Sequence, residues 1–339
     1  MSPIRPALDA LCAEVSDLSA RLGRRVDPAT LGVLDRTGHL PLAPPDLMSP
    51  NGACRLVRAA DGWLAVNLAR EEDRDLVPAW FGCDVGGEPW TLIEAHVGGH
   101  ARAALIDGAT LLGLPAAAVG ETTAERPRAL LIRMAAGGAR HGAPNVLDLS
   151  ALWAGPMCGA ILAAMGASVT KVESVRRPDP TRTATPAFSA NLNGAKTHLV
   201  LDLASQVGQA DLRNRIADAD VLITSARPRA FAALGLDPAA VFDLNPGLVW
   251  TAVTGHGWTG AGAARVGFGD DTAAAGGLVR WTPDGPRFLG DALADPVTGL
   301  AAAVGTLQAL EQGGGLLVDA ALARSAAGAA AICRLPRAA

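Results

Sequence analysis

The chain of 339 residues contains no tyrosine, so no mechanism here can use a tyrosine acid, base or nucleophile. Its cysteines are too few and too scattered for a disulfide scaffold: Cys12, Cys54, Cys83, Cys158 and Cys333. No Cys-X-X-Cys or His/Cys cluster has the spacing of a zinc site, so the sequence predicts no metal. An excess of positive charge is also lacking, because 29 basic and 33 acidic residues give a formal net charge of −4. Nucleic-acid binding is therefore not expected, since it would need a basic excess or stripe.

Long apolar runs of the membrane-spanning kind are missing as well. The uncharged stretch 151–169 contains Pro156, three glycines and much alanine, which favours a buried turn and helix over a spanning segment. The start of the sequence lacks the charged residues and apolar run of a secretory signal, so we expect a cytoplasmic protein. Half of the chain (50%) is hydrophobic and 18% is charged, which provides for a large core and excludes wholesale disorder.

The first half of the sequence predicts a small α+β domain. Apolar spacing indicates a helix over 7–22, and Asp61-Gly62 between two alternating apolar runs indicates a β-hairpin. Further helices are predicted over 71–81 (shortened or kinked by Pro78), 92–106 and 116–126. The weakly patterned stretch 135–144 is the predicted boundary. We therefore divide the chain into a small domain, residues 1–140, and a large domain, residues 141–339.

The second half predicts a parallel sheet covered by helices. Strands are predicted over 146–149, 168–173, 198–203, 221–224 and 248–254. Helical patterns between them indicate βαβ units, hence an α/β fold. Ligands of such sheets bind beyond the carboxyl ends of the strands, so chemistry is expected in the loops after Leu149, Glu173, Thr224 and Thr254. No general phosphate-loop, dinucleotide, zinc-protease or hydrolase motif occurs in its proper context.

Several strings of the second half, read together, resemble the class III CoA-transferases, a family with formyl-CoA and carnitine CoA-transferases and α-methylacyl-CoA racemases. They are VLDLSALWAGP (146–156), GASVTKVE (166–173) with DPTR (179–182), ADADVLITSARP (217–228), LGLD (234–237), NPGLVWTAVTGHG (245–257), ADPVTGL (294–300) and VDAAL (318–322). The resemblance implies a Rossmann-like large domain, a smaller domain and an interlaced homodimer.

Segments of the first half also resemble this family, but they stand earlier in the chain than they do in the relatives. The strings AADGWLAV (59–66) and LGLPAAAV (112–119) look like small-domain segments that follow the large domain in relatives. The order implies a circular permutation, or a chain cut from a tandem arrangement, with a second chain supplying missing parts. Permutation is physically reasonable where chain ends lie close together on a surface.

The resemblance assigns the catalytic nucleophile to Asp295. In the family this carboxylate attacks an acyl-CoA thioester, giving a mixed anhydride and then an aspartyl-CoA thioester that the acceptor acid resolves. Asp295 opens an apolar helix, where exposed backbone N–H groups favour its ionised form. The alternative is a plain helix cap before Pro296. Asp291 is the weaker competitor for the role.

The resemblance also implies contacts with coenzyme A, taken as a substrate together with an acyl-CoA and a small carboxylic acid, with no tightly bound cofactor. Arginine binds phosphate bidentately, although a solvated arginine loop explains Arg176, Arg177 and Arg182 equally well. The sequence has two lysines, Lys171 and Lys196, and the second matches a family position. The expected contacts are Trp153, Ala154, Arg176, Arg182, Lys196, Leu201, Ser225, Ala226, Arg227 and Leu234.

Departures from the family pattern keep other functions open. Where the racemases have a histidine this chain has Phe268, so a two-base racemase is disfavoured. His256 is an alternative acid or base at the expected ligand edge, or a plain loop residue. The glycine-rich loop of the transferases should fall near 44–52, which holds one glycine. A CoA-thioester racemase, isomerase or lyase, and a non-catalytic homologue, remain the alternatives.

Overall fold

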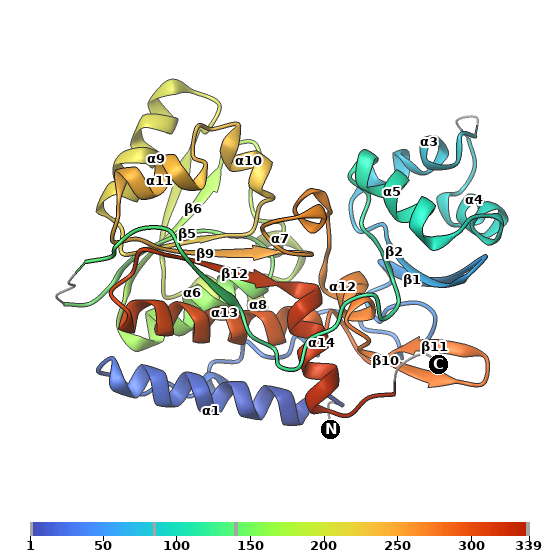
Figure 1. The fold of residues 1–339 in the computed structure, drawn as a ribbon, viewed down its shortest axis with the longest axis horizontal. Helices are drawn as coiled ribbons and strands as arrows, with labels where there is room; N and C mark the ends of the chain where they lie inside the picture. The colour runs from blue at the N-terminus through green and yellow to red at the C-terminus, as the bar shows by residue number, and fades with distance from the viewer. Residues whose placement is uncertain (1–2, 84–85, 139–141, 337–339) are drawn as a thin grey trace.

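The computed structural model describes residues 3–83, 86–138 and 142–336. A seven-stranded sheet organises most of the chain (Figure 1). Its strands, in spatial order, are β4 (Leu130–Arg133), β12 (Leu316–Ala321), β9 (Val249–Thr254), β8 (Val221–Thr224), β5 (Asn145–Leu149), β6 (Ser168–Ser174) and β7 (Thr197–Leu201). All neighbours are parallel except β4, which pairs antiparallel with β12. The fold is mixed α/β with a large, mostly parallel sheet.

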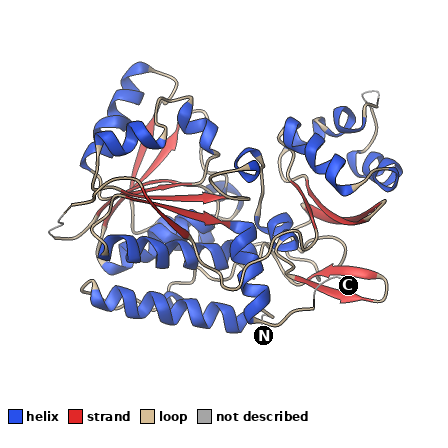
Figure 2. Ribbon diagram, viewed as in Figure 1, coloured by secondary structure: helices blue, strands red, loops and turns tan. Residues whose placement is uncertain are grey.

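Helices cover both faces of this sheet (Figure 2). One face carries α9 (Gln206–Asp218), α10 (Pro228–Ala232) and α11 (Pro238–Leu244). The other carries α6 (Ala154–Met165), α8 (Pro186–Asn193) and α13 (Ala294–Glu311), with α1 (Arg5–Arg21) as an outer layer. The short α7 (Thr181–Ala184) follows the loop after β6, and α14 (Leu322–Ile332) follows β12.

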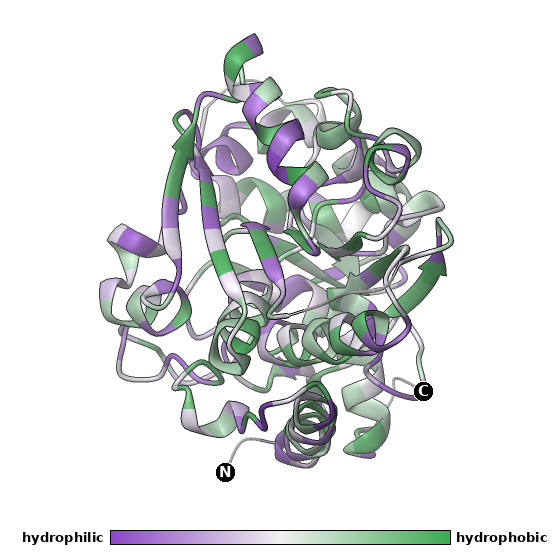
Figure 3. Ribbon diagram, turned by 90° about the vertical axis from the view of Figure 1, so that its left-hand side faces the viewer, coloured by the Kyte–Doolittle hydropathy of each residue, from purple (hydrophilic) through white to green (hydrophobic). Residues whose placement is uncertain are grey.

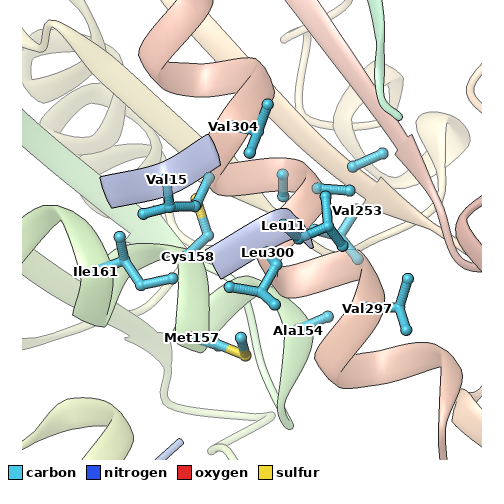
Figure 4. Close-up of a cluster of buried hydrophobic side chains, with 14 of the residues drawn as sticks. Leu11, Val15, Ala154, Met157, Cys158, Ile161, Val253, Val297, Leu300 and Val304 are labelled. Carbon is cyan, nitrogen blue, oxygen red and sulfur yellow. The ribbon is translucent and has the colours of Figure 1, made fainter. Parts of the chain in front are cut away.

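The largest apolar core lies between α1, α6 and α13. Leu11 and Val15 of α1 meet Cys158 of α6 and Leu300 of α13 in one buried cluster (Figure 4). The helices of the outer layers carry both hydrophilic and hydrophobic residues, as helices with one solvent-facing side do (Figure 3). Burial on this scale is the dominant favourable contribution to folding, and it anchors the start of α13 firmly.

A smaller unit stands beside the large sheet. Its sheet consists of β1 (Cys54–Ala59), β2 (Gly62–Asn67) and β3 (Ala116–Ala118), all antiparallel. The helices α2 (Glu71–Asp75), α3 (Val77–Phe81), α4 (Pro89–His96) and α5 (Arg102–Leu112) pack with it in a separate core. The hairpin β10 (Val279–Thr282) and β11 (Gly285–Phe288) and the helix α12 (Gly269–Ala275) connect this unit with the large one.

The predicted strands of the second half are confirmed, as are the N-terminal helix and the first hairpin. The predicted helix over 116–126 is wrong. Residues 116–118 form β3 instead, because Ala116 and Ala118 pair with Val66 and Leu64 of β2, a tertiary contact that overrides the helix propensity of alanine. The single helix predicted over 92–106 is interrupted at Gly98 and Gly99, and the one over 71–81 breaks ahead of Pro78.

Two elements of residues 1–140 do not lie with the small unit. The helix α1 packs on α13, and β4 is an edge strand of the large sheet. The division of the chain at residue 140 stays a prediction, and its boundary stretch includes residues 139–141, which lie outside the described part. Within that described part no helix is long and apolar enough to cross a bilayer. The stretch 151–169 contains the turn and helix expected of it. Cys12, Cys54, Cys83, Cys158 and Cys333 are free in the structure.

Candidate active site

A cavity of about 450 Å³ lies at the carboxyl ends of β5, β8 and β9, and Asn67 and Arg70 of the small unit also line it. The loops after β5, β6, β8 and β9 all line it, which agrees with the prediction that chemistry belongs at this edge. Its volume suits a ligand site, for which about 300–1,000 Å³ is usual. Four lining residues are charged: Arg36, Arg70, Asp270 and Asp295. The site is therefore a largely uncharged cavity with a few placed ionic groups.

Asp295 lies at the second position of α13 and borders this cavity. The turn before it contains Ala292, whose φ of 44° lies in the left-handed region. The backbone N–H of Asp295 donates to the carbonyl of Ala292 (2.9 Å), and its carboxylate accepts from the backbone N–H of Ala154 at the start of α6. Gly269 lies so close that an added Cβ would overlap Asp295 Oδ2. The carboxylate is thus placed between two helix starts, with no room on the side of Gly269.

The environment of Asp295 changes its acidity. Burial is the largest cause and raises the pKa of its carboxyl to about 7. The charges of Asp270 and Asp291 raise the pKa further, whereas Arg36 and the N–H of Ala154 act in the opposite direction. Near neutral pH the group therefore exchanges its proton readily, which is the property of a reactive carboxyl group.

A hydrogen-bonded network fixes the turn that presents Asp295. The Arg36 guanidinium binds both oxygens of Asp291, at 2.5 and 2.9 Å. The Asn51 amide donates to Asp270 and to Asp291, at 2.7 Å each. Asp270 in turn accepts from the backbone N–H of Ala292 at 2.7 Å. Residues from the N-terminal segment thereby hold the strained turn in place.

Asp270 and its neighbour Asp271 are both buried at the start of α12. Burial raises the pKa of Asp270 to about 6 and that of Asp271 to about 8. One oxygen of Asp271 accepts from the N–H of Phe268 (2.9 Å) and from the amide of Asn67 (3.1 Å). The other oxygen has no hydrogen-bond partner in the described structure. Asp271 therefore holds the turn carrying Phe268, which lines the cavity.

Trp153, in the loop after β5, forms part of the cavity wall. Its indole N–H donates to the carbonyl of Val33 (2.8 Å), and its ring meets Phe188 edge-on at 5.2 Å. The Arg36 guanidinium lies 5.1 Å from the centre of the ring. Ala154, the next residue, lines the cavity and starts α6. Trp153 is accordingly both a core aromatic and a wall of the site.

The loop after β5 is held by two buried side chains. Leu152 has a φ of 70°, and both oxygens of Asp179 accept from its N–H at 3.3 Å. Lys171, which is buried, pairs with Asp179 at 3.1 Å and also donates to the carbonyl of Ser150. This lysine positions the loop and does not face the cavity.

Basic side chains gather beside the loop after β8. Ser225 lines the cavity and accepts from the N–H of Ala151 (2.9 Å), and Ala226 next to it is exposed. The pKa of Arg227 is lowered by burial first and then by the charges of Arg229, Arg70 and Arg177. Arginines from three separate segments are therefore near enough to repel one another, an arrangement that an anion would relieve.

Two basic residues predicted to contact coenzyme A, Lys196 and Arg182, form ion pairs with carboxylates of the protein. Lys196 is fully buried and donates to Asp148 (2.7 Å), to the carbonyl of Pro156 (2.8 Å) and to Asn193 (2.9 Å). With its three donors used, it cannot bind a ligand phosphate in this structure, and we correct its role to a structural one. Arg182 pairs with Glu173 at 3.1 Å with its side chain half exposed.

Three more of the predicted contacts, and the alternative acid or base His256, do not line the cavity. Arg176 is exposed in the loop after β6, while Leu201 and Leu234 belong to the core on the α9 side of the sheet. His256 does not line the cavity. Its side chain is buried, its Nε2 has no hydrogen-bond partner in the described structure, and burial together with Arg265 lowers its pKa to about 3. An imidazole in this position is neutral near pH 7 and does not line the cavity.

The sequence reasoning missed Arg36, Asn51 and Asp270. Arg36 and Asn51 lie at the ends of a proline-rich connector without periodicity, so no pattern marks them. The acidic pair at 270 and 271, at the start of a helix after Gly-Phe-Gly, was the one visible signal. Among the described residues, no group of three or more His, Cys, Asp or Glu is arranged to hold a metal ion.

Comparisons with known proteins place the second half of the chain in a family. A sequence profile described as CoA-transferase family III matches residues 144–332, more than half of the chain. A succinyl-CoA–D-citramalate CoA-transferase of Chloroflexus aurantiacus is 34% identical over 193 residues, covering 52% of this chain and 47% of that protein. A succinate–glutarate CoA-transferase of Agrobacterium fabrum is 34% identical over 198 residues, covering 52% and 50%.

A crystal structure of a CaiB/BaiF family protein from Brucella suis superposes with a TM-score of 0.52 at 30% identity. The match covers 57% of this chain and 56% of that one. The chain spans about half the length of the curated relatives it matches.

Proposed function

Because the chain belongs to CoA-transferase family III, we propose that it transfers coenzyme A from an acyl-CoA to a small carboxylic acid, with Asp295 as the nucleophile. The observation that carries the proposal is the position of Asp295, a carboxylate in a cavity at the sheet's ligand edge, backed by the start of α6. A carboxylate nucleophile suits the reaction because it can hold first the donor acyl group and then CoA, so that CoA passes between carboxylates without hydrolysis of the thioester.

The proposed reaction has four balanced steps. Asp295 attacks the thioester carbonyl, the carbon–sulfur bond breaks, and a mixed anhydride and CoA thiolate form. The thiolate attacks the aspartyl carbonyl, which releases the donor carboxylate and leaves an aspartyl-CoA thioester. The acceptor carboxylate attacks that thioester to give a second anhydride and free thiolate. Attack of the thiolate on the acceptor's acyl carbonyl yields the new acyl-CoA and regenerates Asp295.

The surrounding residues support this role by placement and charge. The N–H of Ala154 and the charge of Arg36 favour the ionised, attacking form of Asp295, whereas burial and Asp270 oppose it. The balance leaves a carboxylate that is reactive because few hydrogen bonds and little water stabilise its charge. The close approach of Gly269 limits the rotation of the carboxyl group, so the attacking oxygen is held toward the cavity.

Binding of coenzyme A is proposed at the basic residues beside β8. Arg227, with Arg177 and Arg229 close enough to affect its pKa, offers charge for the phosphates, and Ser225, two residues before it, lines the cavity. Arg176, Arg182, Ala226, Leu201 and Leu234 are retained as proposed contacts of the nucleotide end. We further propose that a second copy, interlaced with the first, completes the site, since the chain spans about half of its relatives' length.

The deciding experiment is intact-protein mass spectrometry after incubation with a panel of acyl-CoAs, followed by hydroxylamine trapping. An adduct that maps to Asp295, and that is lost in Asp295→Ala while coenzyme A still binds, is the expected result. Asp17→Ala, at an exposed ion pair on α1, is the control and should retain the adduct.

Two outcomes would overturn the proposal. Exchange of the α-hydrogen for deuterium without an adduct would identify a racemase, isomerase or lyase that uses Asp295 as a base. Absence of adduct, exchange and CoA binding together would identify a non-catalytic homologue.

A further inference from the structure

Both arginines that line the cavity are already paired with carboxylates, and this pairing limits which acyl groups the cavity can bind. Arg36 is held by both oxygens of Asp291, and Arg70 is held by both oxygens of Asp73. These two arginines are the positively charged residues among the described lining residues. Neither is a free cation for a second carboxylate on a substrate.

The amide donors of the cavity are engaged as well. The Asn51 amide donates to Asp270 and Asp291, and the Asn67 amide donates to Asp271. A second carboxylate on the acyl group would lose its water and would compete with Asp270 and Asp291 for both N–H donors of the Asn51 amide. Burying an ionised group without such partners is strongly unfavourable.

The remaining charge in the cavity is negative. Asp270 and Asp295 both line it, and Asp291 lies directly behind the turn between them. A second carboxylate on the donor acyl group would enter while Asp295 is ionised and would add another negative charge at short range in a poorly solvated space, which is repulsive. The reacting carboxylate of the acceptor arrives later, when Asp295 is an uncharged thioester. By contrast, the walls carry Leu40, Phe188, Val253, Phe268 and Leu322, which favour an apolar group.

We infer that the acyl group accepted at this site is uncharged and apolar, and that acyl groups ending in a second carboxylate are rejected. The inference rests on the proposed function and deepens it by naming the substrate class. It sets this chain apart from the relatives whose names specify succinyl-CoA. The Arg36–Asp291 pair is the specificity-determining element, because it withdraws the arginine nearest to Asp295 from substrate binding.

The test compares butyryl-CoA with succinyl-CoA, which have the same number of acyl carbons and differ in a terminal methyl or carboxylate. With acetate as a common acceptor, kcat/KM should be at least tenfold higher for butyryl-CoA. Asp291→Asn removes the charge that neutralises Arg36, so the ratio should move at least tenfold toward succinyl-CoA. Asp17→Asn makes the same chemical change at an exposed arginine pair and should leave the ratio unchanged.

Equal use of the two thioesters by the wild-type protein, or a preference for succinyl-CoA, overturns the inference whatever the variant does. An unchanged ratio in a folded Asp291→Asn protein overturns the role of the Arg36 pair. Dissociation constants measured by calorimetry separate this inference from the proposed function. Tenfold tighter binding of butyryl-CoA without any transfer refutes the proposed function and supports the inference, whereas binding of neither thioester refutes both.

Discussion

Replacing Asp295 by asparagine should stabilise the protein at high pH while abolishing transfer. The folded state holds the proton of Asp295 more tightly than the unfolded chain does, since burial raises the pKa from 3.8 to about 7. Folding is then favoured by the protonated form, and wild-type stability falls as the pH rises toward 7. Asparagine has a similar shape and cannot ionise, so it removes this pH dependence.

The magnitude follows from the window in which the two states differ. Between about pH 5 and pH 7 the unfolded chain has lost the proton and the folded chain still holds it, so stability falls by about 1.4 kcal/mol for each pH unit. The sum is about 3 kcal/mol. Because Asp295 borders the cavity and keeps partial contact with water, we expect roughly half of that, about 1.5 kcal/mol.

Urea unfolding followed by tryptophan fluorescence measures the effect, and the sequence supplies seven tryptophans. The difference in the free energy of unfolding, Asp295→Asn minus wild type, should be about 1.5 kcal/mol more positive at pH 8 than at pH 5. Asp271 titrates in both proteins, and the difference between them reports Asp295 together with its charge interaction with Asp270. A difference that stays constant across this range, or that reverses, would refute the account of Asp295 as a group whose ionisation opposes folding.

Further predictions concern activity and the buried lysine. Transfer needs the ionised carboxylate, so kcat/KM should fall tenfold per pH unit below about 7 and level off above it; a profile flat to pH 5 would contradict the raised pKa of Asp295. Gly269→Ala places a Cβ 2.7 Å from Cβ of Ala292 and nearer still to Asp295 Oδ2, so turnover should drop about 100-fold. Gly99→Ala, with open space around it, should keep its activity; equal rates in both variants would refute the steric argument. Lys196→Met leaves the buried carboxylate of Asp148 without its cation and should cost about 3–5 kcal/mol in urea unfolding, whereas a loss below about 1 kcal/mol would show that the pair is not needed.

Elements whose conformation is set by residues close to one another in the sequence could be predicted. The parallel strands β5, β6, β7, β8 and β9 and the helices α1, α6 and α13 follow from apolar runs and periodicity, whereas the parallel strand β12 was not predicted. Residues 116–118 show the opposite case. Their alanines favour a helix locally, and pairing with a strand some 50 positions earlier decides their conformation. The hairpin β10–β11 and the helix α12 were also missed, because they are short and packed between two units.

The residues of the candidate site also include some that the sequence could identify and some whose role only the structure shows. Asp295 was identified through a resemblance whose strings lie in the second half, and the structure gives it a cavity to act in. Lys196 was assigned to a ligand on the same resemblance, yet a lysine buried with three protein acceptors has no donor left. A sequence string specifies which residue is present and not which of its hydrogen bonds are already used.

The half of the chain that the family profile does not match still contributes to the site. Arg36 and Asn51 precede residues 144–332, and they bind Asp291 and Asp270 across separations of 255, 240 and 219 positions. These bonds hold the turn that presents Asp295. The geometry of the reactive carboxylate therefore depends on the N-terminal segment, which occupies the stretch where a glycine-rich loop was expected. The circular permutation predicted from the sequence requires that such bracing residues still reach the same turn.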